Sequence, residues 1–172
     1  HGLSVRINGT TDGGYLDDAG YDQQKATVRH DYEDDVWRVS SVLDYANLNQ
    51  ETAGYIQGYK IYKDAGARRE NPNPEAYRDA SSLRFHSAIS RTLDAANTLT
   101  ITPYLRDNEM KFLQHFVPWQ PVEKNDHSSL GLRAALNTDL DTSSWANGLE
   151  LEYTQGNLRE FQEQEFSPNQ PA

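Results

Sequence analysis

Hydrophobic and polar residues alternate along seven stretches of this chain. An alternation with a period of two is typical of a β-strand that turns one side to an apolar environment and the other to a polar one. The pattern therefore predicts an all-β fold, with strands over Leu3–Asn8, Lys25–Tyr32, Trp37–Ala46, Leu83–Ser90, Thr98–Arg106, Ser129–Asn137 and Trp145–Thr154.

The two faces of these predicted strands differ sharply in charge. The apolar phase lacks Asp, Glu, Lys and Arg in every stretch; in the last stretch it runs through Trp145, Leu149, Leu151 and Tyr153. The charged residues lie in the opposite phase and are Arg6, Lys25, Arg29, Asp31, Arg38, Asp44, Arg84, Arg106, Arg133, Glu150 and Glu152. This segregation indicates antiparallel strands with one apolar and one polar face.

Short and long connections alternate between the predicted strands. The short ones are 33–36, 91–97 and 138–144, and the long ones are 9–24, 47–82 and 107–128. The Greek-key crossings of a soluble β-sandwich give no reason for this alternation. In an outer-membrane barrel, by contrast, tight turns lie on the periplasmic side and long loops on the extracellular side. The sequence thus predicts an antiparallel transmembrane β-barrel segment of about seven strands.

Aromatic residues bracket the apolar phase of two predicted strands. Trp37 and Trp145 each follow a short turn, and Tyr45 and Tyr153 each come eight residues later in the same phase. Eight residues of a tilted strand span roughly 20 Å along the membrane normal, close to the apolar band of about 25 Å that aromatic girdles flank. We therefore predict that the apolar face contacts outer-membrane lipid and that the charged face lines a wet lumen.

Seven strands do not close a bacterial barrel, because single-chain barrels there have an even number of strands. Two unpaired edges in hydrocarbon would leave backbone groups without hydrogen bonds, at several kcal/mol each. We therefore expect residues 1–172 to be a segment of a larger barrel.

Composition narrows the possible functions. The mean hydropathy of -0.85 and the lack of a long apolar run exclude transmembrane helices. They do not exclude transmembrane β-strands, because alternating apolar and polar residues give a polar average. The absence of cysteine excludes disulfides, thiolate metal sites and cysteine nucleophiles. The net charge of -10 disfavours nucleic acid as a partner.

Four stretches around the long loops carry a family resemblance: "DDAGYDQQKATVRHDY" (17–32), "ANLNQETAGYIQGYKIYKD" (46–64), "NPNPEAYRDASSLRF" (71–85) and "ITPYLRDNEMKFLQHFVPWQP" (101–121). They resemble the barrel of TonB-dependent outer-membrane receptors of Gram-negative bacteria, most closely those for iron complexes. The resemblance implies a 22-stranded barrel with a plugged lumen. Residues 1–172 would then be a partial barrel domain, without the plug, its TonB box and the remaining strands.

The resemblance also implies a function and partners. Such a receptor takes up an extracellular metal chelate, for example a ferric siderophore, and the TonB complex energises uptake by acting on the plug. Haem, cobalamin or an oligosaccharide remain alternative ligands. A passive porin with an inward-folded loop, or a soluble secreted β-sandwich that binds carbohydrate, are alternative functions. We expect no enzyme activity, no cofactor and no resident metal.

Aromatic residues in the two longest loops are candidate ligand contacts. Tyr55, Tyr59 and Tyr62 are spaced to share one face of a short helix, and Asn73-Pro74 is typical of a helix start. The second loop holds a cluster of Phe112, His115, Phe116 and Trp119. Either group could contact a ligand at the barrel mouth, or pack its loop against itself or the barrel wall.

The charged phase supplies candidate residues for the lumen. They are Arg29, Arg38, Arg84, Arg106, Arg133, Glu150 and Glu152, which would contact a plug or set ion selectivity in an open channel. Although Glu150 and Glu152 share a face, nothing in the sequence supplies the shielded pocket that carboxylate catalysis needs.

Histidines and acidic residues offer weaker candidates. His115 and His127 lack carboxylates at metal-ligand spacing, and His30 and His86 are expected on the apolar and charged faces. The first long loop is acidic, and could be solvated, attract a cationic ligand or hold divalent cations that bridge lipopolysaccharide; its acidic residues are Asp12, Asp17, Asp18 and Asp22.

Overall fold

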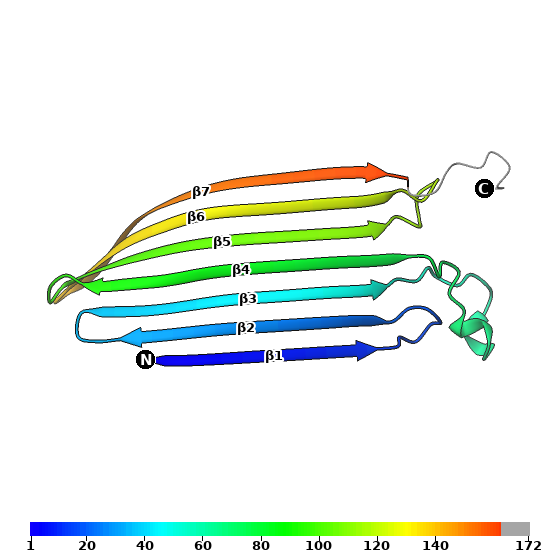
Figure 1. The fold of residues 1–172 in the computed structure, drawn as a ribbon, viewed down its shortest axis with the longest axis horizontal. Coiled ribbons are helices and arrows are strands. Elements are labelled where there is room, and N and C mark those ends of the chain that lie inside the picture. Colours follow the sequence, from blue (N-terminus) through cyan, green and yellow to red (C-terminus); the bar gives the residue numbers. More distant parts are fainter. Residues whose placement is uncertain (163–172) are drawn as a thin grey trace.

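The structure is a computed structural model that describes residues 1–162. These residues form one antiparallel sheet in which every strand pairs with its neighbours in the sequence (Figure 1). The strands are β1 (Gly2–Asp12), β2 (Tyr21–Glu33), β3 (Trp37–Glu51), β4 (Tyr77–Thr92), β5 (Asn97–Leu113), β6 (Val122–Leu140) and β7 (Ser143–Phe161). The predicted all-β fold is confirmed.

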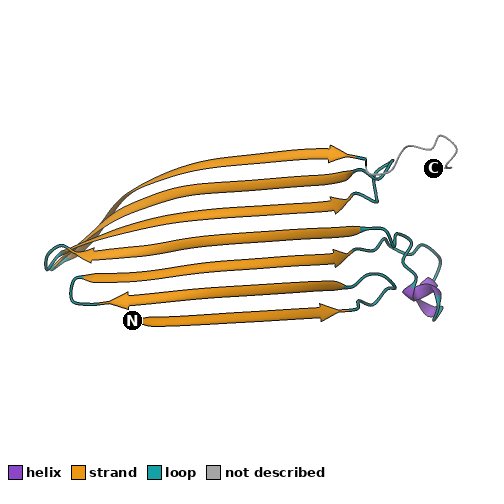
Figure 2. Ribbon diagram, in the orientation of Figure 1, coloured by secondary structure: helices purple, strands orange, loops and turns teal. Residues whose placement is uncertain are grey.

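Within residues 1–162, helix is confined to one long connection, between β3 and β4 (Figure 2). It consists of two short 3₁₀ turns, η1 (Ile61–Lys63) and η2 (Ala67–Arg69). Among the residues described, no helix is long and apolar enough to cross a membrane.

The register keeps the apolar phases of all strands on one side of the sheet. Val5 pairs with Val28, and the same row of apolar-phase residues continues across the sheet through pairs such as Leu43 with Phe85. A one-residue slip would turn a strand's apolar side chains to the other side, so the pattern and the register specify each other. We call the two sides the apolar face and the charged face.

The apolar face is not covered by any other part of the described chain. Leu3, Ile7 and Leu151 expose 71%, 77% and 63% of their surface, and the hydrophobic residues buried within 1–162 are limited to Ala76 and Val122. A β-sandwich would bury this face against a second sheet. The single sheet therefore excludes the sandwich for the described residues.

The short connections all lie at one end of the sheet, which we call the turn end, and the long ones lie at the loop end (Figure 1). In the first turn, the Asp34 carboxylate accepts the backbone N–H groups of Val36 and Trp37 at 2.8 and 2.6 Å. Asp94 accepts those of Ala96 and Asn97, both at 2.9 Å. Aspartate makes such turns because its side chain hydrogen-bonds the backbone two or three residues on.

The strands extend further than predicted at the loop end. The region 107–128, expected to be a loop, is strand except for 114–121, so the prediction was wrong there. The apolar face turns polar at the points where the alternation ends, for example between Leu105 and Asp107 and between Tyr153 and Gln155. Beyond these points both faces carry polar residues, and hydrogen bonding between strands continues without a hydrophobic period.

Candidate functional site

A network of polar side chains on β5, β6 and β7 joins most of the predicted lumen residues. Its centre is Tyr104, whose hydroxyl contacts Glu150 Oε1 at 2.8 Å and Glu152 Oε2 at 2.6 Å. Register places these residues together, because Tyr104 lies opposite Gly131, which in turn lies opposite Glu152. Two carboxylates are thus held side by side on the charged face.

Two arginines neutralise this carboxylate pair. Arg133 donates through Nη2 to both oxygens of Glu150, at 3.1 and 3.0 Å, and Arg106 donates to Glu152. The Thr154 hydroxyl adds a hydrogen bond of 2.9 Å to Glu152. Arg106 Nε is buried without a hydrogen-bond partner among the described residues. With two arginines balancing two carboxylates, the network is suited to bracing the sheet rather than to acid–base chemistry.

Tyr104 was missed by the sequence analysis. Its ring lies over Gly131, where an added Cβ would collide with the ring atoms. Glycine is therefore required there for a close approach. The available signal was a tyrosine in the charged phase of one strand and a glycine in the charged phase of the next.

The other predicted lumen arginines lie outside this network. Arg29 pairs with Asp31 at 2.7 Å, and Arg38 pairs with Glu33 at 2.6 Å. Arg84 lies directly opposite Arg106 and makes no ion pair within residues 1–162. The charged face thus contains local ion pairs and also exposed arginines, Arg84 and Arg6, that make no ion pair within residues 1–162.

The predicted helical face of three tyrosines is not formed. Tyr55 lies in a segment without regular structure, Tyr59 in a turn and Tyr62 in η1. Gly58 at φ 149° and Lys60 at φ 56° interrupt any helix between them. The predicted helix start at Asn73 was also wrong: a turn there, with Ala76 N–H donating to the Asn73 carbonyl at 3.0 Å, leads directly into β4.

The predicted aromatic cluster of the second loop is divided between two elements. Phe112 belongs to β5, on the charged face, where the Arg78 guanidinium lies 6.0 Å from its ring. His115 and Phe116 stand edge to face in the loop, with ring centroids 5.5 Å apart. Trp119 is exposed and has left-handed backbone at φ 66°.

The four bracketing aromatics are exposed on the apolar face, as their phase requires. When paired positions are followed from β3 across the sheet to β7, Trp37 aligns with the residue two positions after Trp145. In the same way, Tyr45 aligns with the residue two positions after Tyr153. The two tryptophans are therefore offset along the sheet by the same two residues, and in the same direction, as the two tyrosines. The spacing between tryptophan and tyrosine is thus the same on β3 and β7.

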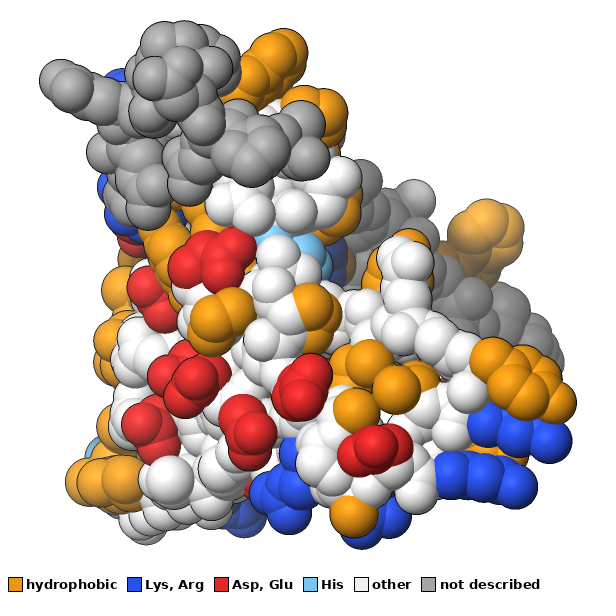
Figure 3. All heavy atoms as spheres, turned by 90° about the vertical axis from the view of Figure 1, so that its right-hand side faces the viewer, with side chains coloured by type: hydrophobic (Ala, Val, Ile, Leu, Met, Phe, Trp, Pro, Cys, Tyr) orange, Lys and Arg blue, Asp and Glu red, His pale blue; other side chains and the backbone are white. Residues whose placement is uncertain are grey.

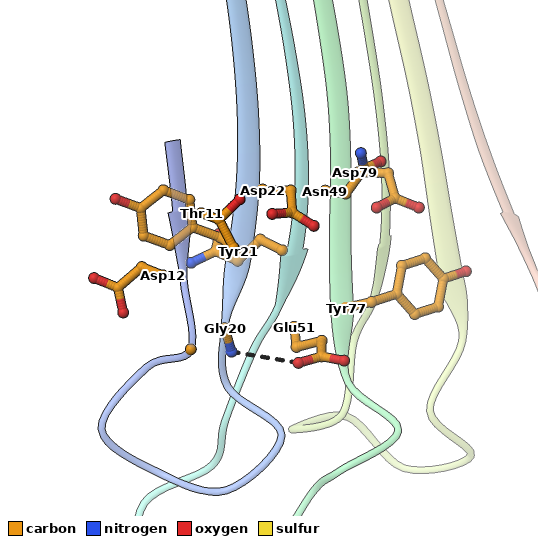
Figure 4. Close-up of a pocket in the computed structure, with 11 residues that line it drawn as sticks. Thr11, Asp12, Gly20, Tyr21, Asp22, Asn49, Glu51, Tyr77 and Asp79 are labelled. Carbon is orange, nitrogen blue, oxygen red and sulfur yellow. Dashed lines mark hydrogen bonds between the residues drawn. The ribbon is translucent and has the colours of Figure 1, made fainter. Parts of the chain in front are cut away.

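An open, acidic cavity of about 300 Å³ lies at the loop end between β1 and β4 (Figure 4). Of the predicted acidic residues, Asp12 and Asp22 line it, together with Glu51 and Asp79. Glu51 accepts the Gly20 N–H at 3.3 Å. No cluster of three or more metal-ligating side chains occurs in the described part of the chain, so the structure offers no donor set for a metal ion here.

Comparison with known proteins identifies the fold rather than a family. No protein-family model matches the sequence, and no curated protein is significantly similar to it. Among solved structures, the chain is similar to the unliganded ferric citrate transporter FecA, with a TM-score of 0.70 and 11% identity over 92% of this chain. The match spans 24% of the transporter's chain. The chain therefore has the fold of a β-barrel segment of the kind found in a transporter.

Proposed function

We propose that this chain is part of the barrel of a TonB-dependent outer-membrane receptor that imports an iron chelate, such as a ferric siderophore, in a Gram-negative bacterium. The observation that carries the proposal is the continuous apolar face, which no other part of residues 1–162 covers and which aromatic residues bracket on β3 and β7. An apolar surface of this extent is stable only when it is covered, and a bilayer covers it along its whole length.

Three observations favour a receptor over a passive channel. The sequence resembles TonB-dependent receptors, and the sheet shares its fold with a ferric citrate transporter. The strands are also long, at 19 residues in β6 and β7, whereas about 9–11 residues cross a bilayer. Their polar extensions would rise well above the membrane and form the wall of an external vestibule.

The proposal assigns roles to the residues on each face. Residues 1–172 form a partial barrel domain, and further strands pair with the free edges of β1 and β7. The charged face surrounds a plug, which Arg84 contacts and through which the TonB complex acts. The ligand contacts the outer loops; the candidates are Tyr55, Tyr59, Tyr62, Phe112, His115, Phe116 and Trp119.

Uptake of radioactive iron by cells that express the full-length protein tests the proposal. We expect uptake from a ferric chelate to require both the protein and an intact TonB complex. Uptake that continues at the same rate without the TonB complex would instead identify a passive channel, and no uptake from any chelate would contradict iron transport.

A further inference from the structure

One segment of the β3–β4 loop is basic although the chain is acidic. Between Tyr55 and Arg69 lie four basic residues, Lys60, Lys63, Arg68 and Arg69, and one acidic residue, Asp64, for a net charge of +3 against -10 for the whole chain. We call residues 55–69 the basic loop segment. The sequence analysis considered its tyrosines but not its cations.

The positive charge of this segment is not neutralised within residues 1–162. None of the ion pairs between described residues involves it. The acidic residue of the segment, Asp64, bonds to the backbone instead of to a basic side chain: one of its carboxylate oxygens accepts the N–H groups of Gly66 and Ala67 at 3.0 and 2.9 Å. The segment therefore presents its cations to solvent.

The cations lie next to exposed aromatic rings. The Lys60 ammonium is 4.9 Å from the centroid of the Tyr59 ring, and Tyr59 exposes 90% of its surface. Tyr62 and Lys63 are both in η1, and Tyr62 is 65% exposed. Positive charge beside an uncovered ring offers an anion both an ion pair and an apolar surface.

The segment is held in place by the first loop. The Asp17 N–H donates to the Arg69 carbonyl at 2.8 Å, and the Asn71 side chain donates to the Asp18 carbonyl at 2.8 Å. The Arg69 guanidinium lies 5.8 Å from the Tyr15 ring. These contacts order the loop before a ligand binds, and so reduce the entropic cost of binding.

Charge is segregated at the loop end of the molecule. Figure 3 shows acidic side chains over the middle of this end and Lys and Arg side chains along its lower and lower right margin. An anion approaching this end is repelled by the acidic area and attracted to the basic margin, whose field steers it there.

We propose that the basic loop segment is a capture site for an anionic metal chelate, in which Lys60, Lys63 and Arg68 supply the positive charge and Tyr59 and Tyr62 the contact surface. The proposal rests on the proposed function and specifies the ligand class. A neutral chelate gains nothing from these cations, and a cationic chelate is repelled by them.

The test measures binding of two iron chelates to the full-length protein in detergent: ferric citrate, which is anionic, and a neutral ferric trihydroxamate. The loop variant is Lys60→Glu/Lys63→Glu. The matched control is Lys124→Glu/Arg159→Glu, which makes the same change in net charge on the apolar-face side of β6 and β7. Circular dichroism checks that both variants keep their strand content.

We expect the loop variant to weaken ferric citrate binding about tenfold at low ionic strength, and less in high salt, because exposed charges are screened. The control should change affinity less than about twofold. Equal losses in both variants, or no loss in the loop variant, would overturn the capture site. If the wild type then still binds the neutral chelate, the proposed function survives; if it binds neither chelate, both proposals fail.

Discussion

Leu132 and Arg133 are adjacent on β6 and point to opposite faces of the sheet. Leu132 lies on the apolar face, and Arg133 pairs with Glu150 on the charged face at 3.0 Å. If the apolar face contacts lipid, Leu132→Arg should cost roughly 2–4 kcal/mol of folding free energy, as arginine does near the middle of a bilayer. Arg133→Leu removes an exposed ion pair and should cost only about 0.2–1 kcal/mol. Urea unfolding of the full-length protein in lipid vesicles measures both, and similar losses would argue against a lipid-facing surface.

Gly131 provides a second test at the level of single residues. Gly131→Ala should push the Tyr104 ring away from Glu150 and Glu152 and cost about 1 kcal/mol, the net value of a typical hydrogen bond. In a Tyr104→Ala background the same substitution should cost nearly nothing, because the ring is gone. Gly156→Ala is the control, since its added Cβ would meet only ordinary contacts, the nearest at 3.6 Å. A Gly131 penalty that persists without Tyr104 would show that another contact causes it.

At the scale of the elements, the sequence predicted the strands well wherever one face is apolar. The predicted starts of β3 and β5 lie within one residue of the observed ones, because a short turn and the alternation coincide there. At the loop end the predictions stop where the apolar face stops, near Ala46, Arg106 and Ser129. Beyond that point both faces carry polar residues, so backbone pairing continues while the hydrophobic period that reveals a strand disappears.

The loops and the site were less predictable for a related reason. The spacing of Tyr55, Tyr59 and Tyr62 fits a helix, but a left-handed residue at Lys60 prevents one, and no short-range pattern signals it. Tyr104 could be assigned to the charged face from its phase. Its contact with Glu150 and Glu152 depends on the register between three strands, which alternation within each strand does not determine.

The turn between β2 and β3 should stabilise the protein in a pH-dependent way. The Tyr32 hydroxyl and the N–H groups of Trp37 and Val36 donate to Asp34 and lower the pKa of its carboxyl below the usual value. Because the folded-state pKa is depressed, the stabilisation is complete above the unfolded pKa of about 3.9 and is lost as the pH falls through the folded pKa. Asp34→Ala should therefore lower stability at neutral pH and have progressively less effect as the pH falls below about 4.

Unfolding measured at several pH values checks this prediction. Asp35→Ala is the control, because the Asp35 carboxylate makes no hydrogen bond among residues 1–162. A penalty for Asp34→Ala that is the same at neutral and acidic pH would mean that the charged carboxylate does not stabilise the turn.

At the scale of the whole molecule, the account depends on an apolar face that needs a cover and a charged face that needs water. Within the described residues, the sheet has no second layer to provide the cover. A bilayer fits because the apolar band is continuous across all the strands and bounded by polar residues at the loop end. If the sheet lies in a bilayer, its two edges, β1 and β7, need further strands to pair with their backbone groups. The chain matches 24% of the transporter of similar fold.

The most direct test labels single cysteines introduced at consecutive positions of β6, where residues 1–172 contain no cysteine of their own. Spin labels at Leu132, Arg133, Ala134 and Ala135 of the full-length protein in lipid vesicles are exposed to oxygen, which concentrates in lipid, and to a water-soluble nickel chelate. We predict that oxygen accessibility is high at 132 and 134 and that nickel accessibility is relatively higher at 133 and 135. The same accessibility at all four positions, or the opposite alternation, would contradict a sheet with one face in the membrane.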